Sequence, residues 1–374
     1  MASTVYKIPL SRPDHPDDPE ALLATLREIV MSGRWTEGEF ALSFERRVAE
    51  LCGSVYAVAT NSGTSALESI CAAVGLEPES EVICPSYTFI ATVNAVMSSG
   101  ATPVFADIHP KTYNLDLNDV AAKLTKKTRA IVLVHQFGIP ADGRAFLNFC
   151  REQNLILIED GACGLGSKYD GRSLGTFGMA GLLSFHPRKV VSTGEGGMVL
   201  TDREDIAVRA RVYGNHGRQR DQGGLAISVG HNYRMSEFHA ALGLWALERL
   251  GEAIDRRKRA ARRYDDALRS MEGVTIILEP GRAEWNRQSY PVRIQGERRE
   301  RIANELRKKG IETSPGPLPA HIHPYIVASL HPPRLSETES AYEGTLLLPM
   351  YAALTENDQS QVIGALQNAL ASCR

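Results

Sequence analysis

Seven short apolar runs, separated by helical stretches, restrict the fold of residues 55–202 more than any other feature of this sequence. They lie at residues 55–60, 82–84, 104–106, 130–134, 155–158, 182–185 and 198–200. The runs do not alternate strictly between apolar and polar residues, which is typical of strands in a sheet covered on both faces. Strands that alternate with helices predict an α/β fold, whose ligands gather beyond the carboxyl ends of the strands.

Helical patterns flank this region on both sides. Apolar residues at helical spacing predict two amphipathic helices before residue 55 and a long, charged helical stretch over about 236–269. Beyond it, strands near 274–277 and 289–294, helices at 300–309 and after 355, and a proline-rich loop at 315–333 predict a smaller α+β unit. We therefore expect a large domain at residues 1–250 and a small C-terminal domain at residues 251–374.

The composition argues against several classes of protein. Lys and Arg total 42 against 44 Asp and Glu, a net charge of −2, which does not indicate a nucleic-acid-binding surface. No apolar run approaches the roughly 20 residues of a membrane span, and the N-terminal residues lack a signal-peptide pattern. Six scattered cysteines without a matching histidine cluster predict neither a disulfide framework nor a metal site. These features predict a cytoplasmic protein without nucleic-acid or membrane partners.

A candidate phosphate site follows the first predicted strand. Gly63, Thr64 and Ser65 open an apparent helix there, and the N–H groups of a helix N-terminus can bind a phosphate. The same pattern is also typical of an ordinary Ser/Thr helix cap. The motif alone therefore leaves both interpretations open.

Two further stretches carry charge next to apolar strands. Asp160 comes directly after a predicted strand, where a partly desolvated carboxylate needs a cation unless it caps the next element. Lys189 lies in a glycine-rich turn between two apolar strands and is a candidate Schiff-base lysine. Arg188 beside it is interpreted as an ordinary solvated residue, because a charged loop residue is usually exposed to solvent. A phosphate cradle, a buried carboxylate and a loop lysine are the groups that pyridoxal 5′-phosphate (PLP) requires.

The order of these features resembles the DegT/DnrJ/EryC1/StrS family of aminotransferases, the sugar and cyclitol branch of fold-type I enzymes. The similarity runs almost from end to end, through residues 33–36, 61–67, 85–89, 159–160, 184–197, 230–235 and 348–351. It implies a fold-type I PLP-dependent transferase, with a mixed, mostly parallel seven-stranded sheet in the large domain and a smaller C-terminal α+β domain.

The resemblance also implies an activity and its substrates. An amino group would move from an amino acid, glutamate or glutamine, to a keto-sugar or keto-cyclitol, with a nucleotide-linked sugar favoured, in amino-sugar or natural-product biosynthesis. Lys189 would form the Schiff base and carry protons, and Asp160 would pair with the pyridinium nitrogen of the cofactor.

The remaining site residues follow from the same resemblance. The cofactor phosphate would be held by Gly63, Thr64 and Ser184, with Tyr87 stacked on the ring and Cys163 beside the phenolic oxygen. Asn232 would reach the phosphate bound in a neighbouring subunit, which implies a homodimer with shared sites. The candidate substrate contacts are Trp35, Thr36, His135, His321, His323 and Tyr325.

Cys163 departs from the family pattern, in which Gln or His occupies this position. A thiol is a weak hydrogen-bond donor, so the change indicates either an unusual substrate or reaction, or a tolerated substitution that a water or neighbour compensates. Two alternative functions remain open. One is a sugar dehydratase or another atypical enzyme of the family, although dehydratase members carry His where this chain has Lys189. The other is a regulator that binds PLP without turnover.

Overall fold

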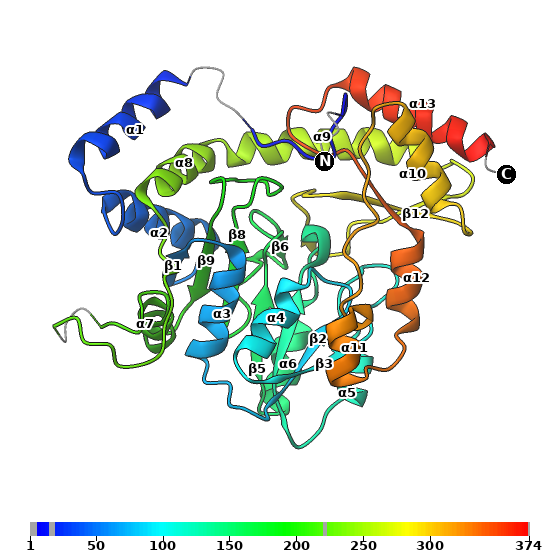
Figure 1. The fold of residues 1–374 in the computed structure, drawn as a ribbon. Coiled ribbons are helices and arrows are strands. Elements are labelled where there is room, and N and C mark those ends of the chain that lie inside the picture. Colours follow the sequence, from blue (N-terminus) through cyan, green and yellow to red (C-terminus); the bar gives the residue numbers. More distant parts are fainter. Residues whose placement is uncertain (1–5, 15–18, 220–222, 373–374) are drawn as a thin grey trace.

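The computed structural model describes residues 6–14, 19–219 and 223–372, arranged around one central sheet (Figure 1). The seven strands have the order β1-β9-β8-β5-β4-β2-β3. At one edge, β1 (Tyr56–Thr60) is antiparallel to β9 (Gly197–Thr201), and β9 is antiparallel to β8 (Ala180–Ser184). The strand β9 therefore runs against its neighbours, while β1 and β8 point the same way.

The other four strands continue the sheet in parallel from β8. They are β5 (Ile156–Asp160), β4 (Thr128–Val134), β2 (Glu81–Pro85) and β3 (Thr102–Ala106). Six of the seven strands thus end at the same edge. The predicted α/β fold with a mixed, mostly parallel seven-stranded sheet is confirmed.

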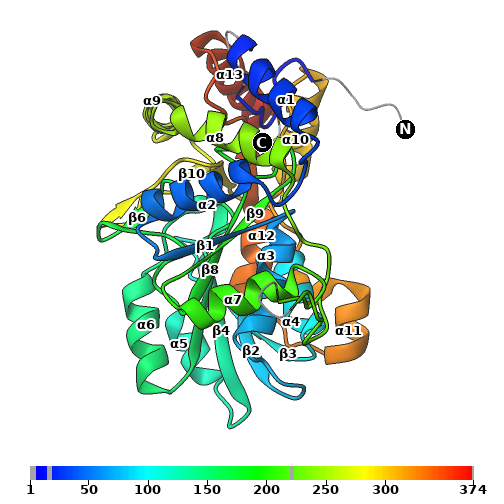
Figure 2. The same ribbon diagram turned by 90° about the vertical axis from the view of Figure 1, so that its left-hand side faces the viewer.

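Helices cover both faces of this sheet. Figure 2 shows α3 (Gly63–Ala73) and α4 (Ala91–Ser98) on one side, and α5 (Leu117–Ala122) and α6 (Gly143–Glu152) on the other. The helix α7 (Glu204–Tyr213) packs on α3. Burial on both faces explains why the strands read as continuous apolar runs.

The helices at the amino end and after the sheet lie close together. The two helices predicted before residue 55 are α1 (Glu20–Ser32) and α2 (Glu39–Cys52), and both α1 and α2 contact α8 (Glu237–Glu248). The helical stretch that follows the sheet is interrupted, because Arg249 (φ −101°, ψ −1°) separates α8 from α9 (Leu250–Leu268).

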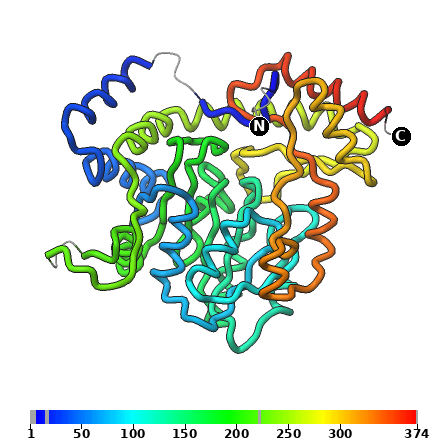
Figure 3. The backbone as a smooth tube through the Cα atoms, in the orientation of Figure 1, coloured from blue at the N-terminus to red at the C-terminus, as the bar shows by residue number. Residues whose placement is uncertain are grey.

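The C-terminal part contains a second, antiparallel sheet, β10 (Val274–Ile276), β12 (Tyr290–Ile294) and β13 (Thr345–Leu348). Its core includes α9, α10 (Arg299–Lys308) and α13 (Glu356–Ser372). The N-terminal segment joins this unit, since Ile8 pairs with Ile311, and Figure 3 shows the segment beside the C-terminal part.

The two units share chain segments. Beyond residue 250, α11 (Pro324–Leu330) packs beside the large sheet, and Ile326 belongs to the same apolar core as α3. The short strand β11 (Ala283–Glu284) pairs with β6 (Lys168–Tyr169), which in turn pairs with β7 (Arg172–Ser173). The domain boundary at residues 250 and 251 stays a prediction, and it coincides with the first residues of α9. Within the described ranges, none of the helices has the length and apolar character needed to span a bilayer.

Candidate active site

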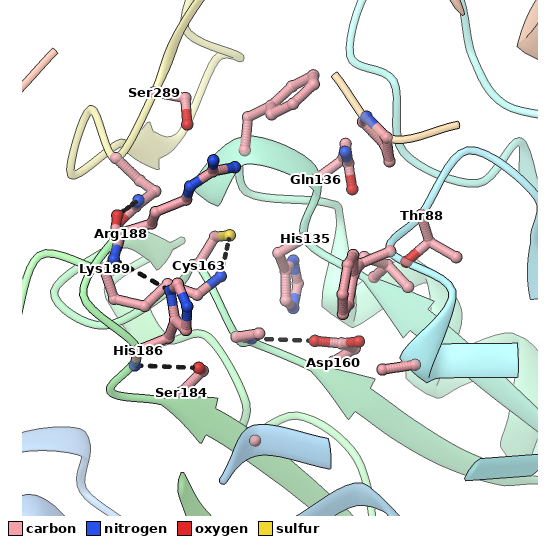
Figure 4. Close-up of a pocket in the computed structure, with 18 of the residues that line it drawn as sticks. Thr88, His135, Gln136, Asp160, Cys163, Ser184, His186, Arg188, Lys189 and Ser289 are labelled. Carbon is pink, nitrogen blue, oxygen red and sulfur yellow. Dashed lines mark hydrogen bonds between the residues drawn. The ribbon is translucent and has the colours of Figure 1, made fainter. Parts of the chain in front are cut away.

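A cavity of about 640 Å³ opens at the edge where the parallel strands end. The turns after β1, β2, β4, β5 and β8 form its floor, and segments near residues 288, 314–318 and 347–350 cover it from the C-terminal part. Ligands of open α/β sheets bind at this edge because the loops after the parallel strands converge there. Figure 4 shows the side chains that line the cavity.

Asp160, the last residue of β5, places a carboxylate on the cavity floor. The side chain is held by two hydrogen bonds: Ala162 N donates to Oδ1 at 3.0 Å, and Thr92 Oγ1 donates to Oδ2 at 2.8 Å. Asp160 is only 8% exposed, and no Lys, Arg or His of the described ranges forms an ion pair with it. The two donors fix the direction of the carboxylate, and the absence of a cation of the described ranges beside it leaves room for a cationic ligand in the cavity.

Lys189 reaches into the cavity from the turn after β8. Its Nζ lies 3.1 Å from Cys163 Sγ and donates a hydrogen bond to it. In Figure 4, Lys189 and Cys163 occupy one side of the cavity and Asp160 the other. A cofactor that bonds the amine at one end and the carboxylate at the other would therefore span the cavity.

The N-terminus of α3 supplies an anion site at the rim. Ser62 and Ser65 cap the helix reciprocally, each side-chain oxygen accepting from the other residue's N–H at 3.0 Å. The N–H groups of Gly63 and Thr64 have no acceptor within the described part of the chain, and both residues line the cavity. A Cβ atom on Gly63 would lie 2.9 Å from Ser184 Cβ, so glycine allows the helix to approach β8.

These groups fit PLP. The cradle of free N–H groups suits a phosphate, the isolated carboxylate suits a pyridinium nitrogen, and the amine suits an aldehyde. The structure brings together Gly63, Thr64, Asp160, Ser184 and Lys189, as the sequence predicts. Cys163 lines the cavity too.

A second buried acid lies directly behind the site. Glu159 and His135 side chains are both fully buried, and their Oε1 and Nε2 atoms are 3.0 Å apart. Glu159 also accepts from the N–H groups of Gly175 and Gly178, at 2.9 and 2.7 Å. His135 Nδ1 accepts from Ala141 N, so the ring carries its proton on Nε2 and donates it to Glu159.

Replacement of Glu159 by alanine should lower the free energy of unfolding by about 3–5 kcal/mol, because three buried donors would lose their acceptor. Urea denaturation followed by fluorescence measures this difference. Glu152→Ala, at the exposed end of α6, should change it by less than about 0.5 kcal/mol. Equal effects of the two substitutions would contradict a supporting role for the Glu159 network.

The structure places Tyr87 away from the position that the sequence predicts. Tyr87 is fully buried and packs edge-on against Tyr113 and Phe137, and its hydroxyl donates to Pro315 O at 3.4 Å. It does not line the cavity, whereas Phe89, which is 71% exposed, does. The chain after β2 turns the Tyr87 ring into an aromatic cluster with Phe137, which also lines the cavity, whereas Phe89 is the exposed aromatic residue of the lining.

Most of the predicted substrate residues lie outside the cavity of their own chain. Of the six, only His135 lines it. Trp35 packs near Phe238, and Thr36 pairs with Ser236. The five substrate candidates outside the cavity are Trp35, Thr36, His321, His323 and Tyr325. The cofactor-binding candidate Asn232 also lies outside it.

His321 connects the cover of the cavity to β2. Its Nδ1 lies 2.6 Å from Ser86 Oγ, and its main-chain N–H donates to the same oxygen at 3.0 Å. Tyr325 donates to Asn94 Oδ1. These contacts hold the segment after Gly316, so His321 positions the cavity wall and does not face its interior.

Sequence reasoning missed several residues of the cavity. Thr92 holds Asp160 from α4, and Gln288 lines the cavity from the C-terminal part. No motif distinguishes either residue, because each reaches the site only through the packing of distant segments. Within the described ranges, no group of three or more His, Cys, Asp or Glu side chains could hold a metal ion.

Comparison with known protein families matches residues 16–367 to the DegT/DnrJ/EryC1/StrS aminotransferase family. A GDP-perosamine synthase of Caulobacter vibrioides is 38% identical over 341 residues, which cover 89% of this chain and 91% of the relative. A dTDP-4-dehydro-2,3,6-trideoxy-D-glucose 4-aminotransferase of Saccharopolyspora spinosa is 35% identical over 325 residues, 83% of each protein.

Solved structures agree with the sequence comparison. The crystal structure of the aminotransferase TlmJ from Streptoalloteichus hindustanus superposes with a TM-score of 0.92 at 33% sequence identity. The superposition covers 98% of this chain and 99% of that one.

Proposed function

Because the chain belongs to the DegT/DnrJ/EryC1/StrS aminotransferase family and is a PLP-dependent aminotransferase, we propose that it moves the amino group of glutamate or glutamine to the ketone of a nucleotide-linked sugar. The observation that carries the proposal is the cavity in which Asp160 and Lys189 occupy opposite sides. The free N–H groups of α3 provide an anchor for a phosphate at the rim of this cavity.

Each residue of the site has a distinct task in this proposal. Bound PLP supplies an aldehyde and an electron-withdrawing ring, which together take up the donor's amino group and release it to the acceptor. Asp160 would accept a hydrogen bond from the ring nitrogen and keep that nitrogen protonated. Lys189 Nζ would take the proton from the donor carbon that carries the amine and pass it to the cofactor in the first half-reaction, and would take it back and deliver it to the acceptor carbon in the second. The phosphate is held by Gly63, Thr64 and Ser184.

The relatives support a nucleotide-linked acceptor. One is named for a GDP-linked product and another for a dTDP-linked substrate, and each matches more than four fifths of this chain. The cavity volume of about 640 Å³ lies within the usual range of about 300–1,000 Å³ for ligand sites. We therefore favour a keto-sugar nucleotide over a free keto-cyclitol.

The experiment follows the two half-reactions separately. Holoenzyme is mixed with glutamate, glutamine, alanine or aspartate. The visible absorbance of the cofactor and the amount of keto acid released are then measured. The aminated enzyme is then mixed with GDP- or dTDP-linked 4-keto sugars or with a keto-cyclitol, and the amine product is identified by mass. Amination of the cyclitol alone would contradict the proposed substrate class.

We also propose that the enzyme is a homodimer with shared sites. Leu225, Ile227 and Val229 are 68%, 54% and 80% exposed and alternate along the arm of residues 223–234, which lies beside α7 (Figure 1). Asn232 lies on this arm with its carbonyl bonded to Asn61, and it does not face the cavity of its own chain. A second copy would cover the apolar arm and receive Asn232 at its phosphate site.

Subunit complementation tests this arrangement. Lys189→Ala and Asn232→Ala should each be strongly impaired as homodimers. Coexpression of the two should restore about a quarter of the wild-type activity per protomer, because half of the dimers are mixed and each mixed dimer has one intact site. A mixture no more active than its components, although mixed dimers are present, would contradict shared sites.

The state of the described cysteines bears on the cellular compartment of the enzyme. None of the five forms a disulfide. We accordingly place the enzyme in the reducing cytoplasm.

A further inference from the structure

The cavity contains a cation that the roles given above do not use. Arg188 is exposed and lines the cavity, and it forms no ion pair with an acid of the described residues. Figure 4 shows its side chain extending across the cavity from the turn that carries Lys189, on the side away from Asp160. The Arg188 side chain is thus both accessible to solvent and directed into the cavity.

The main chain at Arg188 is held on both sides. Its N–H donates to His186 Nδ1 at 3.2 Å, and its carbonyl accepts from Gln288 Nε2. Gln288 belongs to the C-terminal part, so the turn after β8 is held by a bond within itself and by a bond from the C-terminal part. These bonds fix the main chain from which the Arg188 side chain extends.

The other basic groups that line the described cavity are unsuited to binding an anion. His135 is neutral, because its Nδ1 accepts from Ala141 N and its Nε2 bonds to Glu159. Burial lowers the pKa of His186, which favours its neutral form. Lys189 is committed to the cofactor and to proton transfer. Among the described residues that line the cavity, Arg188 is then the one permanent cation free to pair with a substrate.

An amino-acid donor brings a carboxylate into this cavity next to the carbon on which Lys189 acts. A carboxylate that leaves water needs a cation or several hydrogen-bond donors, and a guanidinium offers two parallel N–H groups. We propose that Arg188 binds the carboxylate of the amino donor, an inference that rests on the proposed function. The diphosphate of a nucleotide-linked acceptor is the other anion, but the sugar ring separates it from the reacting carbon.

The first test is equilibrium binding to the holoenzyme by titration calorimetry. The probes are glutarate, which has carboxylates but no amine, and GDP and dTDP. Arg188→Gln should weaken glutarate binding at least about tenfold and leave nucleotide binding unchanged, and Arg188→Lys should retain part of the glutarate affinity. Arg307→Gln removes the same charge from the exposed face of α10 and should bind all probes as the wild type does.

Kinetics separate the two half-reactions. In Arg188→Gln the KM for the amino donor should rise while the KM for the keto acceptor stays unchanged. Loss of GDP or dTDP affinity with unchanged glutarate affinity would overturn the proposal and assign Arg188 to the acceptor. Unchanged glutarate binding, or none by the wild type, would overturn it as well. If no amino acid converts the holoenzyme, the proposed function fails, whereas glutarate binding still tests Arg188.

Discussion

Replacement of Lys189 by alanine should reduce transamination by at least about 10⁴-fold, because it removes both the nucleophile and the proton carrier. Lys189 Nζ is the only side-chain amine that lines the described cavity. The amine donates a hydrogen bond to Cys163 Sγ at 3.1 Å. A thiol is a weak hydrogen bonder and would replace the lysine poorly as a base. The variant should still fold, since the amine makes no other hydrogen bond with the described residues.

Borohydride reduction followed by intact-protein mass measures the covalent link directly. Wild-type protein should gain the mass of the reduced cofactor on Lys189, and Lys189→Ala should gain none. Lys308→Ala, on the exposed face of α10, is the matched control and should behave as the wild type does. Attachment of the cofactor to the alanine variant would show that another amine forms the bond.

Asp160→Asn should lower the rate of transamination by about 10²–10³-fold with little change in size or packing. The substitution keeps one oxygen that can accept from Ala162 N–H, which bonds to Oδ1 at 3.0 Å in the wild type. The Thr92 hydroxyl, which donates to Oδ2 at 2.8 Å, would instead accept from the new amide group. The substitution removes the negative charge that keeps the ring nitrogen of the cofactor protonated, so the ring withdraws electrons less effectively.

Spectral titration of the bound cofactor distinguishes a charge effect from a packing effect. In Asp160→Asn the visible absorbance should titrate at a different pH from that of the wild type, in parallel with the loss of rate. Thr92→Val removes one hydrogen bond but keeps the carboxylate, and it should cost much less activity. Equal losses in the two variants would mean that geometry, and not charge, accounts for the effect.

The structure shows what Cys163, which differs from the residue implied by the family resemblance, contacts. The thiol accepts a hydrogen bond from Lys189 Nζ, at the position where the family resemblance implies Gln or His. The chain is nevertheless an aminotransferase by its family and relatives. The substitution therefore does not indicate a dehydratase or a protein that only binds the cofactor.

The strands of the large sheet and the polar residues at their ends could be predicted from the sequence, whereas the order of the strands across the sheet could not. The apolar runs are local, and Asp160 and Ser184 are the last residues of β5 and β8. The strand β13 was not predicted, because its four residues directly follow a helix and show no pattern of their own. The break at Arg249 was equally invisible, since the apolar spacing continues across it.

The sequence by itself determined the α/β sheet and the candidate cofactor-binding groups at its edge, because these groups lie at the ends of apolar runs or in the turns that follow them. Only the tertiary structure decided which side chains of each turn face the cavity. It turned Tyr87 into an aromatic cluster and left Phe89 exposed, and it placed His321 behind the cavity wall. It also brought Arg188 into the site through Gln288. Side-chain direction after a strand depends on packing between distant segments, and that packing is not encoded in local spacing.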